Sequence, residues 1–285
     1  MTGIEHITAA SPPRHRATAP PALPSPLRIG LSRVVPELKM FYRRPEQVVL
    51  TFSMPAVICL LLGSIFSEEL PGSQTSTGAV IAASMLAYGI LSASFVNLGT
   101  SIAVDRDTGA LRRLRGTPTT ASSYFIGKIA LVAVVSLAEA VLLLAVGVLA
   151  FGLRLPADGF GWFTLAWVSV LGIVSCSLLG IFISNLASNA VSAAVITNGP
   201  SVALQFVSGT YVPLMILPTW MLVIGSLFPV KWMAQGFRSV LLPAELVALE
   251  PAGSWEHWRI FLVLAAWSIA GLIGCLAMFR WSDRT

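Results

Sequence analysis

Long apolar segments are the feature that most restricts how this 285-residue chain can fold. A helix that crosses a membrane needs about 20 mostly apolar residues, because the hydrocarbon core is about 30 Å thick and offers backbone polar groups no partner. The chain contains six such segments, at residues 48–66, 79–104, 124–151, 162–183, 190–208 and 258–279. The sequence therefore predicts an all-α membrane protein with six transmembrane helices.

The composition independently excludes a soluble domain. Hydrophobic residues make up 55% of the chain, charged residues make up 11%, and the mean hydropathy is +0.81. Soluble domains carry about 25% charged residues. We therefore expect a multi-pass protein of the cell membrane that contacts lipids. Its net charge of +5 fits membrane orientation and contact with anionic lipids, and we find no nucleic-acid-binding motif.

The first 44 residues differ in character from the rest of the chain. Residues 1–26 contain six prolines and no apolar run, which predicts a disordered cytoplasmic tail and not a signal peptide. In residues 27–44 apolar and basic side chains interleave, a pattern typical of a helix at the membrane interface, with Pro36 interrupting or bending it. We place the transmembrane domain at residues 27–285.

Residues 209–257 are apolar but are interrupted by prolines, among them Pro213, Pro218 and Pro229. These divide the stretch into pieces of about ten residues, which are too short to cross a bilayer. We predict an extracellular re-entrant hairpin before the last span, and the alternative is a seventh span. Charge favours six spans, because they place 14 of the 18 Lys and Arg residues on the cytoplasmic side, as the positive-inside rule requires. Both termini would then be cytoplasmic.

Polar residues inside this hairpin share one face of a predicted helix. Lys231, Gln235 and Arg238 are spaced four and then three positions apart, which aligns them along the helix. This face could meet lipid headgroups or substrate. The alternative is snorkelling, in which the long side chains reach water at the outer interface.

A short basic segment separates the second and third apolar segments. Asp105, Asp107 and Thr108 are typical N-cap residues, and Gly116 and Pro118 are stop signals. We therefore expect about two turns of helix between the two sets of signals.

The expected helix is amphipathic. Leu111 and Leu114 lie three positions apart on one face, and Arg112, Arg113 and Arg115 point elsewhere. Such a helix can contact a partner or lie flat at a membrane surface. The alternative is a solvated turn whose arginines only fix the orientation of the membrane spans.

Two motifs in the chain resemble those of a known family. The first consists of Asp105, Arg106, Asp107, Gly109, Leu111, Leu114, Thr117 and Pro118, followed by Gly127 and Lys128. It resembles the cytoplasmic loop of ABC-2 type permeases, the membrane subunits of one class of ATP-driven exporters. The second, which is similar to the family's signature before its last span, includes Gly209, Pro213, Leu217, Pro218, Trp220, Pro229 and Arg238. The chain departs from the family at Asp105, where Glu is more common, and this keeps the charge.

The resemblance implies partners and a function. A permease of this family is expected to work with a second permease chain, identical or different, and with an ABC ATPase subunit that binds ATP and magnesium. Residues 105–118 resemble a coupling helix that docks into the ATPase, through Asp105, Arg106, Asp107, Gly109, Leu111, Arg112, Leu114, Thr117 and Pro118. An amphiphilic drug or lipid-like cargo would fit the daunorubicin-resistance branch, which the chain resembles, although saccharide-exporting members share these motifs.

The sequence offers no chemistry of its own for using ATP. It contains no G-x-x-x-x-G-K-[ST] loop, because Gly127 and Lys128 are followed by Ile129 and lack the upstream glycine. The three histidines lie outside the predicted spans, and no metal-binding spacing occurs. We therefore expect a transport subunit that is not an enzyme and binds no cofactor or metal.

Glu139 is the one ionisable residue deep inside a predicted span. An ionised side chain there costs about 2.5–3.5 kcal/mol on insertion scales, so it should face protein or water. It could face substrate, carry a proton, or be a neutral, hydrogen-bonded residue that fixes helix packing. The alternative proteins are a proton-coupled secondary transporter that uses Glu139 and a membrane anchor without transport. Weaker candidates for a substrate path or for helix-to-helix hydrogen bonds are Asn97, Asn198 and Gln205.

Overall fold

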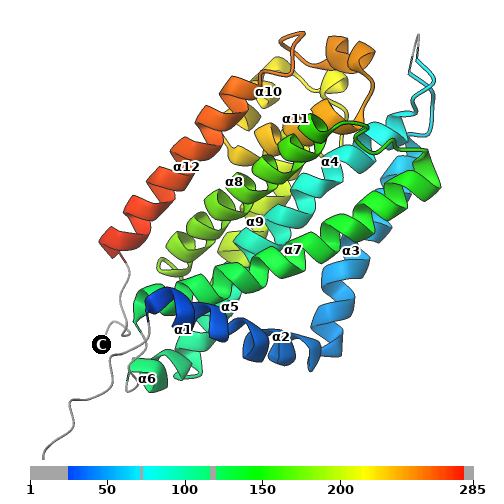
Figure 1. Cartoon of the computed structure of the whole chain (residues 1–285). Coiled ribbons are helices and arrows are strands. Elements are labelled where there is room, and N and C mark those ends of the chain that lie inside the picture. Colours follow the sequence, from blue (N-terminus) through cyan, green and yellow to red (C-terminus); the bar gives the residue numbers. More distant parts are fainter. Residues whose placement is uncertain (1–24, 71–72, 116–119, 279–285) are drawn as a thin grey trace, which may run out of the picture.

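The computed structural model describes residues 25–70, 73–115 and 120–278, and these residues are almost entirely helical (Figure 1). Within these ranges, six helices are long and apolar enough to cross a membrane. They are α3 (Pro45–Ile65), α4 (Thr77–Leu91) continued by η1 (Ser92–Asn97) and α5 (Leu98–Asp107), α7 (Ala121–Phe151), α8 (Gly159–Ser184), α9 (Ala190–Val207) and α12 (His257–Met278). The predicted all-α membrane fold with six spans is confirmed, and each boundary lies within three residues of the expected one. Most of the tail expected at residues 1–26 lies outside the described residues.

The second span is the centre of the helix bundle. Its α4, η1 and α5 run without a break from Thr77 to Asp107, and 89% of its apolar stretch is buried, against 44% or less for the other spans. Many of its residues are Ala, Gly or Ser, which let neighbouring helices approach closely. This span can occupy the core because its small side chains allow other helices to pack closely around it.

Halfway along the second span, η1 is π-helical, a wider turn that is frequent at functional sites. It packs against α7, α8 and α9. The contact with α8 is close, because a Cβ added to Gly180 would lie 2.8 Å from the carbonyl oxygens of Ser94 and Phe95. A change in the winding of η1 would therefore reach three other spans.

Two short helices precede the first span, α1 (Pro26–Ser32) and α2 (Val34–Tyr42). The break expected at Pro36 falls three residues earlier, at Arg33, because Pro36 has no N–H to bond the carbonyl of Ser32 and is tolerated in the first turn of α2. α1 lies close against α7, since a Cβ added to Gly127 would lie 3.0 Å from the carbonyl oxygen of Gly30.

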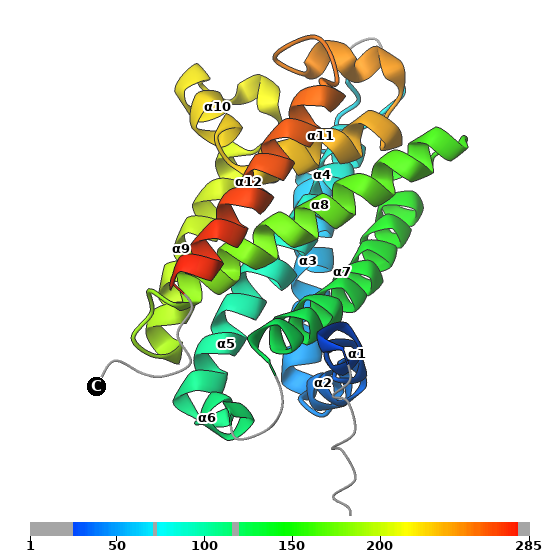
Figure 2. The ribbon, with the colours of Figure 1, turned by 60° about the vertical axis from the view of Figure 1, so that its left-hand side comes forward.

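The segment between α9 and α12 forms short helices, and none that the structure describes is long enough to cross a membrane. They are η2 (Leu214–Ile216), α10 (Thr219–Ser226), α11 (Pro229–Leu241) and η3 (Ala244–Leu249). Figure 2 shows α10 and α11 at the same end of the bundle as the start of α4. α11 packs against α4, α8 and α12, so this segment is anchored on the bundle.

The polar face expected on α11 exists, but it is buried. Lys231, Gln235 and Arg238 are only 6%, 1% and 3% exposed. Burial lowers the pKa of Lys231, whose ammonium nitrogen lies 4.2 Å from the centre of the Trp232 ring. Gln235 Nε2 donates to the carbonyl oxygen of Trp255 at 3.3 Å. Because these side chains are buried within the chain, contact with lipid headgroups and snorkelling to water, both expected as possibilities for this face, are wrong.

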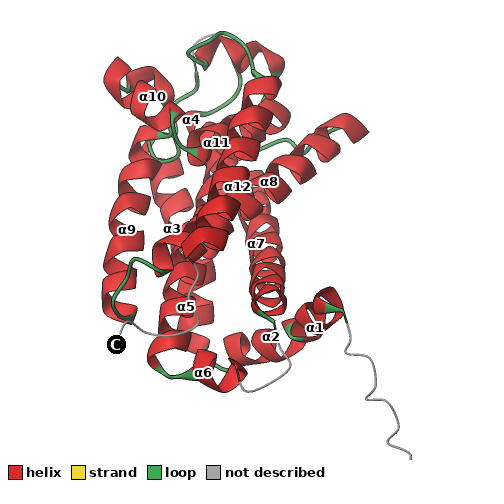
Figure 3. Cartoon of the chain, turned by 90° about the vertical axis from the view of Figure 1, so that its left-hand side faces the viewer, coloured by secondary structure: helices red, strands yellow, loops and turns green. Residues whose placement is uncertain are grey.

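The bundle has two distinct ends (Figure 3). The α6 end holds α1, α2, α6 (Ala110–Arg115) and the turn between α8 and α9, and the last residues described in α12 lie there too. The α11 end holds α10, α11 and the loop after α3, where Glu69 and Ser76 form an isolated strand-like bridge. The basic segment and the short N-terminal helices are therefore gathered at the end opposite the hairpin.

Candidate functional site

The expected coupling helix is divided at Gly109. α5 continues to Asp107, Thr108 caps its C-terminus, and α6 begins only at Ala110. Gly109 has a φ of +70°, a left-handed conformation that favours glycine and ends the helix. Asp105 and Asp107 therefore lie in the last turn of α5, and their expected role as N-caps of the coupling helix is wrong.

The end of α5 instead holds the turn between α8 and α9. Arg106 donates from Nη2 to the carbonyl oxygen of Ser184 at 2.9 Å and from Nη1 to that of Ala187 at 3.2 Å. Asp107 Oδ2 accepts a hydrogen bond from the backbone N–H of Ala190 at 2.6 Å. A cation thus meets the C-terminus of α8 and an anion meets the N-terminus of α9, the arrangement that helix dipoles favour.

Asp105 belongs to a second polar group at the α6 end, the Lys128 cluster, which consists of Glu37, Asp105, Tyr124 and Lys128. Lys128 Nζ lies 3.0 Å from Glu37 Oε2 and 3.0 Å from Asp105 Oδ2. The Tyr124 hydroxyl donates to the same oxygen of Asp105 at 2.7 Å. Lys128 and Glu37 are 6% and 7% exposed, and such burial is tolerated because the charges are paired. The cluster links α2, α5 and α7.

α6 packs against α5 of its own chain. Leu111 is 1% exposed, and Leu114 is half-buried against the same core. Leu111 is therefore unavailable as an apolar anchor for a partner, and that part of the expected docking surface is wrong. Arg112 and Arg113 are exposed. Two further expected coupling residues lie outside the described residues, Thr117 and Pro118.

A cavity of about 440 Å³ lies beside the Lys128 cluster, within the size range of small-molecule sites. Side chains from α2, the start of α3, η1, α5, α7 and α9 line it. Its polar and charged lining consists of Glu37, Arg44, Gln47, Asn97, Thr100, Ser101, Asp105, Lys128 and Asn198. The structure therefore brings four residues singled out from the sequence, Asn97, Asp105, Lys128 and Asn198, to one site.

The lining of this cavity changes with depth. On α7, Lys128 lies at the α6 end, and Val132 and Val135 follow along the helix toward the other end. At 1.5 Å per residue, Lys128 and Val135 are separated by about 10 Å along the helix axis. On the second span, Asp105 likewise lies at the α6 end and Val96 lies further in. The cavity thus has charged groups at the α6 end and mainly apolar walls further in, an arrangement that matches a polar head and an apolar tail.

Glu139 and Gln205 lie apart from this cavity. Glu139 is 1% exposed and packs against Gly89 of α4, where an added Cβ would lie 3.0 Å from the carboxyl carbon. Neither carboxyl oxygen of Glu139 has a hydrogen-bond partner within the described ranges. Gln205 is 2% exposed and donates from Nε2 to Ser201 Oγ of its own helix at 3.2 Å.

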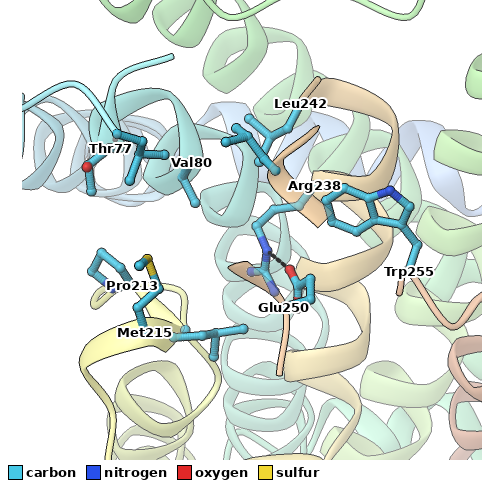
Figure 4. Close-up of a pocket in the computed structure, with 12 residues that line it drawn as sticks. Thr77, Val80, Pro213, Met215, Arg238, Leu242, Glu250 and Trp255 are labelled. Carbon is cyan, nitrogen blue, oxygen red and sulfur yellow. Dashed lines mark hydrogen bonds and ion pairs between the residues drawn. The ribbon is translucent and has the colours of Figure 1, made fainter. Parts of the chain in front are cut away.

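A smaller cavity, of about 30 Å³, lies at the α11 end (Figure 4). Arg238 donates from Nε to Glu250 Oε1 at 2.6 Å and from Nη1 to Ser84 Oγ at 3.0 Å. Gly209 and Pro213, from the second motif, line the same cavity. The structure thus groups Gly209, Pro213 and Arg238. The other singled-out members of that motif lie outside the cavity lining, namely Leu217, Pro218, Trp220 and Pro229.

Sequence reasoning missed Glu37, Ser84, Tyr124 and Glu250 as members of these polar groups. Their hydrogen-bonded partners lie 91, 154, 19 and 12 positions away, so no helical spacing indicates them. One signal was present, because Glu37 is the single acidic residue within the basic stretch 27–44.

These features define a helical multi-pass membrane protein with a buried central span and a cavity at one end. Residues 34–242 match the family model of the ABC-2 type transporter, which covers more than half of the chain. The chain therefore belongs to the ABC-2 type transporter family. It is a membrane transport subunit of an ABC transporter, and its sequence carries no P-loop motif. The curated proteins contain no match to it.

Proposed function

We propose that this chain is the permease of an ATP-driven exporter that moves an amphiphilic drug or lipid-like molecule out of the cell, as in the daunorubicin-resistance branch. The observation that carries the proposal is the 440 Å³ cavity with charged groups at one end and apolar walls further in. An amphiphile in the inner leaflet holds its head at the interface and its tail in the hydrocarbon region. The cavity likewise offers charged groups at one end and apolar walls further in.

The proposal places the α6 end in the cytoplasm, with both termini, and makes the α10–α11 segment an extracellular re-entrant hairpin. The excess of Lys and Arg near the α6 end supports this orientation. The short N-terminal helices would lie at the inner interface. Their exposed apolar side chains, which support that placement, are Leu27, Leu31, Val35 and Met40.

Energy would come from an ABC ATPase subunit that binds ATP and magnesium, and the pathway would form with a second permease chain. α6 would dock on the ATPase, with the exposed Arg112 and Arg113 facing the partner. Because α5 continues without a break into η1 and α4, movement of α6 would be carried into the spans that line the cavity. The spans would then alternate between inward-open and outward-open arrangements.

Two other functions fit less of the structure. A proton-coupled transporter is favoured by Glu139, a buried carboxyl group without a described hydrogen-bond partner. A polysaccharide exporter would use the amide and hydroxyl groups of the lining, but the valine and leucine walls beside them suit an apolar tail better than a sugar. The family assignment supports an ABC transporter, and the apolar walls of the cavity support an amphiphilic cargo.

The test is transport into inside-out vesicles that contain the permease and its ATPase, with a fluorescent amphiphile, ATP and a collapsed proton gradient. We expect uptake that requires ATP and no proton gradient. Uptake that requires the gradient and not ATP would favour the proton-coupled alternative instead.

A matched pair of variants on α9 connects transport to the cavity. Asn198 is exposed in the cavity lining, so Asn198→Trp should fill the space and reduce transport about tenfold or more, since about 1.4 kcal/mol is tenfold in binding. Val195 is 68% exposed and does not line the cavity, so Val195→Trp should transport normally. Both variants must retain the ATPase on purification. Normal transport by Asn198→Trp would exclude this cavity from the pathway.

A further inference from the structure

Both carboxylate partners of Lys128 have a second partner of their own. Glu37 Oε1 lies 3.6 Å from Arg33 Nη2. Asp105 Oδ2 accepts the Tyr124 hydroxyl at 2.7 Å. If another anion bound Lys128, Glu37 would keep its ion pair with Arg33 and Asp105 would keep the hydrogen bond from Tyr124, which reduces the cost of giving up Lys128 at this buried site.

A second cation faces the same cavity. Arg44 follows α2, lines the cavity and is exposed. None of the ion pairs formed among the described residues involves Arg44. Lys128 and Arg44 thus provide an ammonium and a guanidinium group, the two side-chain donors best suited to phosphate or carboxylate oxygens.

We propose that the charged end of the cavity selects amphiphiles with an anionic headgroup, a phosphate or a carboxylate, and that Lys128 determines this specificity. The inference rests on the proposed function and names its cargo class. A cationic headgroup that bound Glu37 or Asp105 would deprive the buried Lys128 of a partner, and it would share the cavity with the exposed Arg44. An uncharged headgroup forms no ion pair with either cation.

Binding of an anion at Lys128 should also affect the proposed coupling helix. Asp105 lies in the last turn of α5, two positions before Asp107 and five before α6. An anion that replaces Asp105 at Lys128 therefore changes what holds the end of α5. ATP hydrolysis by the partner should respond to binding, so its stimulation is a direct readout.

Three probes with the same tail test the headgroup preference, namely dodecyl phosphate, dodecylamine and dodecyl glycerol. The permease–ATPase complex is placed in phosphatidylcholine liposomes, and ATP hydrolysis and ATP-driven movement of each probe are measured. We expect dodecyl phosphate to act at about ten- to a hundredfold lower concentration than the other two, the value of a hydrogen bond to a charged group. Equal responses, or a preference for dodecylamine, would overturn the inference.

A lipid of the inner leaflet and an added alkyl phosphate present the same chemistry to this site. A parallel experiment with fluorescent phosphatidylglycerol in the liposomes distinguishes these two sources. Movement of this lipid from one leaflet to the other would show that a bilayer lipid is cargo. ATP-driven movement of either anionic molecule in preference to dodecylamine and dodecyl glycerol supports the inference. Movement of dodecylamine or dodecyl glycerol without movement of either anionic molecule overturns it.

Variants assign the preference to the two cations. Lys128→Met should raise the half-maximal concentration of dodecyl phosphate about ten- to a hundredfold, and Lys128→Arg should restore most of the response. Arg44 is exposed and forms none of the ion pairs among the described residues. Arg44→Gln therefore gives a second test that disturbs no buried group. The control is Lys39→Met, which removes an exposed cation of α2 that does not line the cavity. An unchanged preference in both Lys128→Met and Arg44→Gln would overturn the inference.

The two proposals fail in different ways. If the unmodified complex moves none of the probes with ATP, the proposed export function is wrong. If it moves all three equally well, export stands and the anionic preference is wrong.

Discussion

Asp107 holds the first turn of a helix that begins 83 positions later in the chain, because its Oδ2 accepts the backbone N–H of Ala190 at 2.6 Å. The neighbouring Arg106 binds carbonyl oxygens of Ser184 and Ala187, at and just after the end of α8. Arg106 and Asp107 therefore fix the α8–α9 turn to α5. A movement of α5 would carry α9 with it, and α9 contributes Asn198 to the cavity.

Asp107→Ala should destabilise the isolated permease by about 1 kcal/mol, the typical net contribution of one hydrogen bond, because Asn189 remains as the N-cap of α9. Asp107→Asn should cost less, because it keeps an oxygen acceptor for the N–H of Ala190. The measurement is thermal unfolding of the purified permease in detergent without its ATPase. Glu245→Ala, at an exposed acidic residue, is the control. If Asp107→Ala unfolds like the unmodified chain, the hydrogen bond contributes nothing and the motif serves docking alone.

The same residues show what sequence alone could and could not predict. The six spans follow from the length and hydrophobicity of local segments, and they were placed within three residues. Asp105 and Asp107 were assigned to the wrong helix end, because an acid before a helix has the pattern of an N-cap wherever its side chain points. Their true partners, Lys128 and Ala190, are set by how helices far apart in the sequence pack.

The buried polar groups were beyond local reasoning for a related reason. Lys128 and Glu37 are 91 positions apart, and each lies in a segment where a basic or acidic residue at the interface is unremarkable. For Arg238 the sequence predicts contact with lipid headgroups or substrate, or snorkelling to water, because its helix lies in a predicted hairpin at the outer interface. The partner that retains it inside, Glu250, follows η3, and nothing in its neighbours indicates burial.

The six-span topology can be tested with a matched pair of exposed serines. Ser254 lies between η3 and α12, and Ser188 lies in the turn between α8 and α9. With both termini in the cytoplasm, Ser254→Cys should react with an impermeant maleimide in intact cells, and Ser188→Cys should react only after permeabilisation. The three native cysteines are buried, and a variant that lacks them gives the background. Labelling of Ser188→Cys in intact cells would invert the proposed orientation.

Glu139→Gln should leave ATP-driven transport near normal. The carboxyl group has no hydrogen-bond partner among the residues that the structure describes, so an amide of the same shape breaks no described contact. Transport is compared with that of the unmodified chain at equal expression. A large loss of transport with normal assembly would contradict this expectation and assign a proton or cation role to Glu139.

The structure changes the expected effect of mutating α6. Leu111→Ala should destabilise the permease itself by about 2–5 kcal/mol, the cost of truncating a buried leucine, because Leu111 is 1% exposed within its own chain. Arg113→Glu, at an exposed position, should leave the permease stable and reduce co-purification of the ATPase. Full retention of the ATPase by Arg113→Glu, at raised as well as low salt, would show that this face of α6 is not the docking surface.

The ion pair between Arg238 and Glu250 should be essential for the stability of the α11 end. Both side chains are 3% exposed, and their contact of 2.6 Å ties α11 to the segment after η3. Glu250→Gln would leave the guanidinium group buried without an anion, which costs about 3–5 kcal/mol. We expect a clear fall in the unfolding temperature of the purified permease.

A double variant distinguishes the lost charge pair from lost packing. Arg238→Met combined with Glu250→Leu removes both charges, and it should recover most of the stability because apolar residues of similar volume can replace a buried pair. Ser84, which loses its contact with Arg238, still donates from Oγ to the carbonyl oxygen of Val80 at 2.8 Å. The control is Arg259→Ala at a side chain that is 65% exposed, where a surface pair contributes only about 0–1 kcal/mol. Equal effects of Glu250→Gln and Arg259→Ala would mean that Arg238 is solvated, and that α11 is held to α4 by its apolar contacts and not by this ion pair.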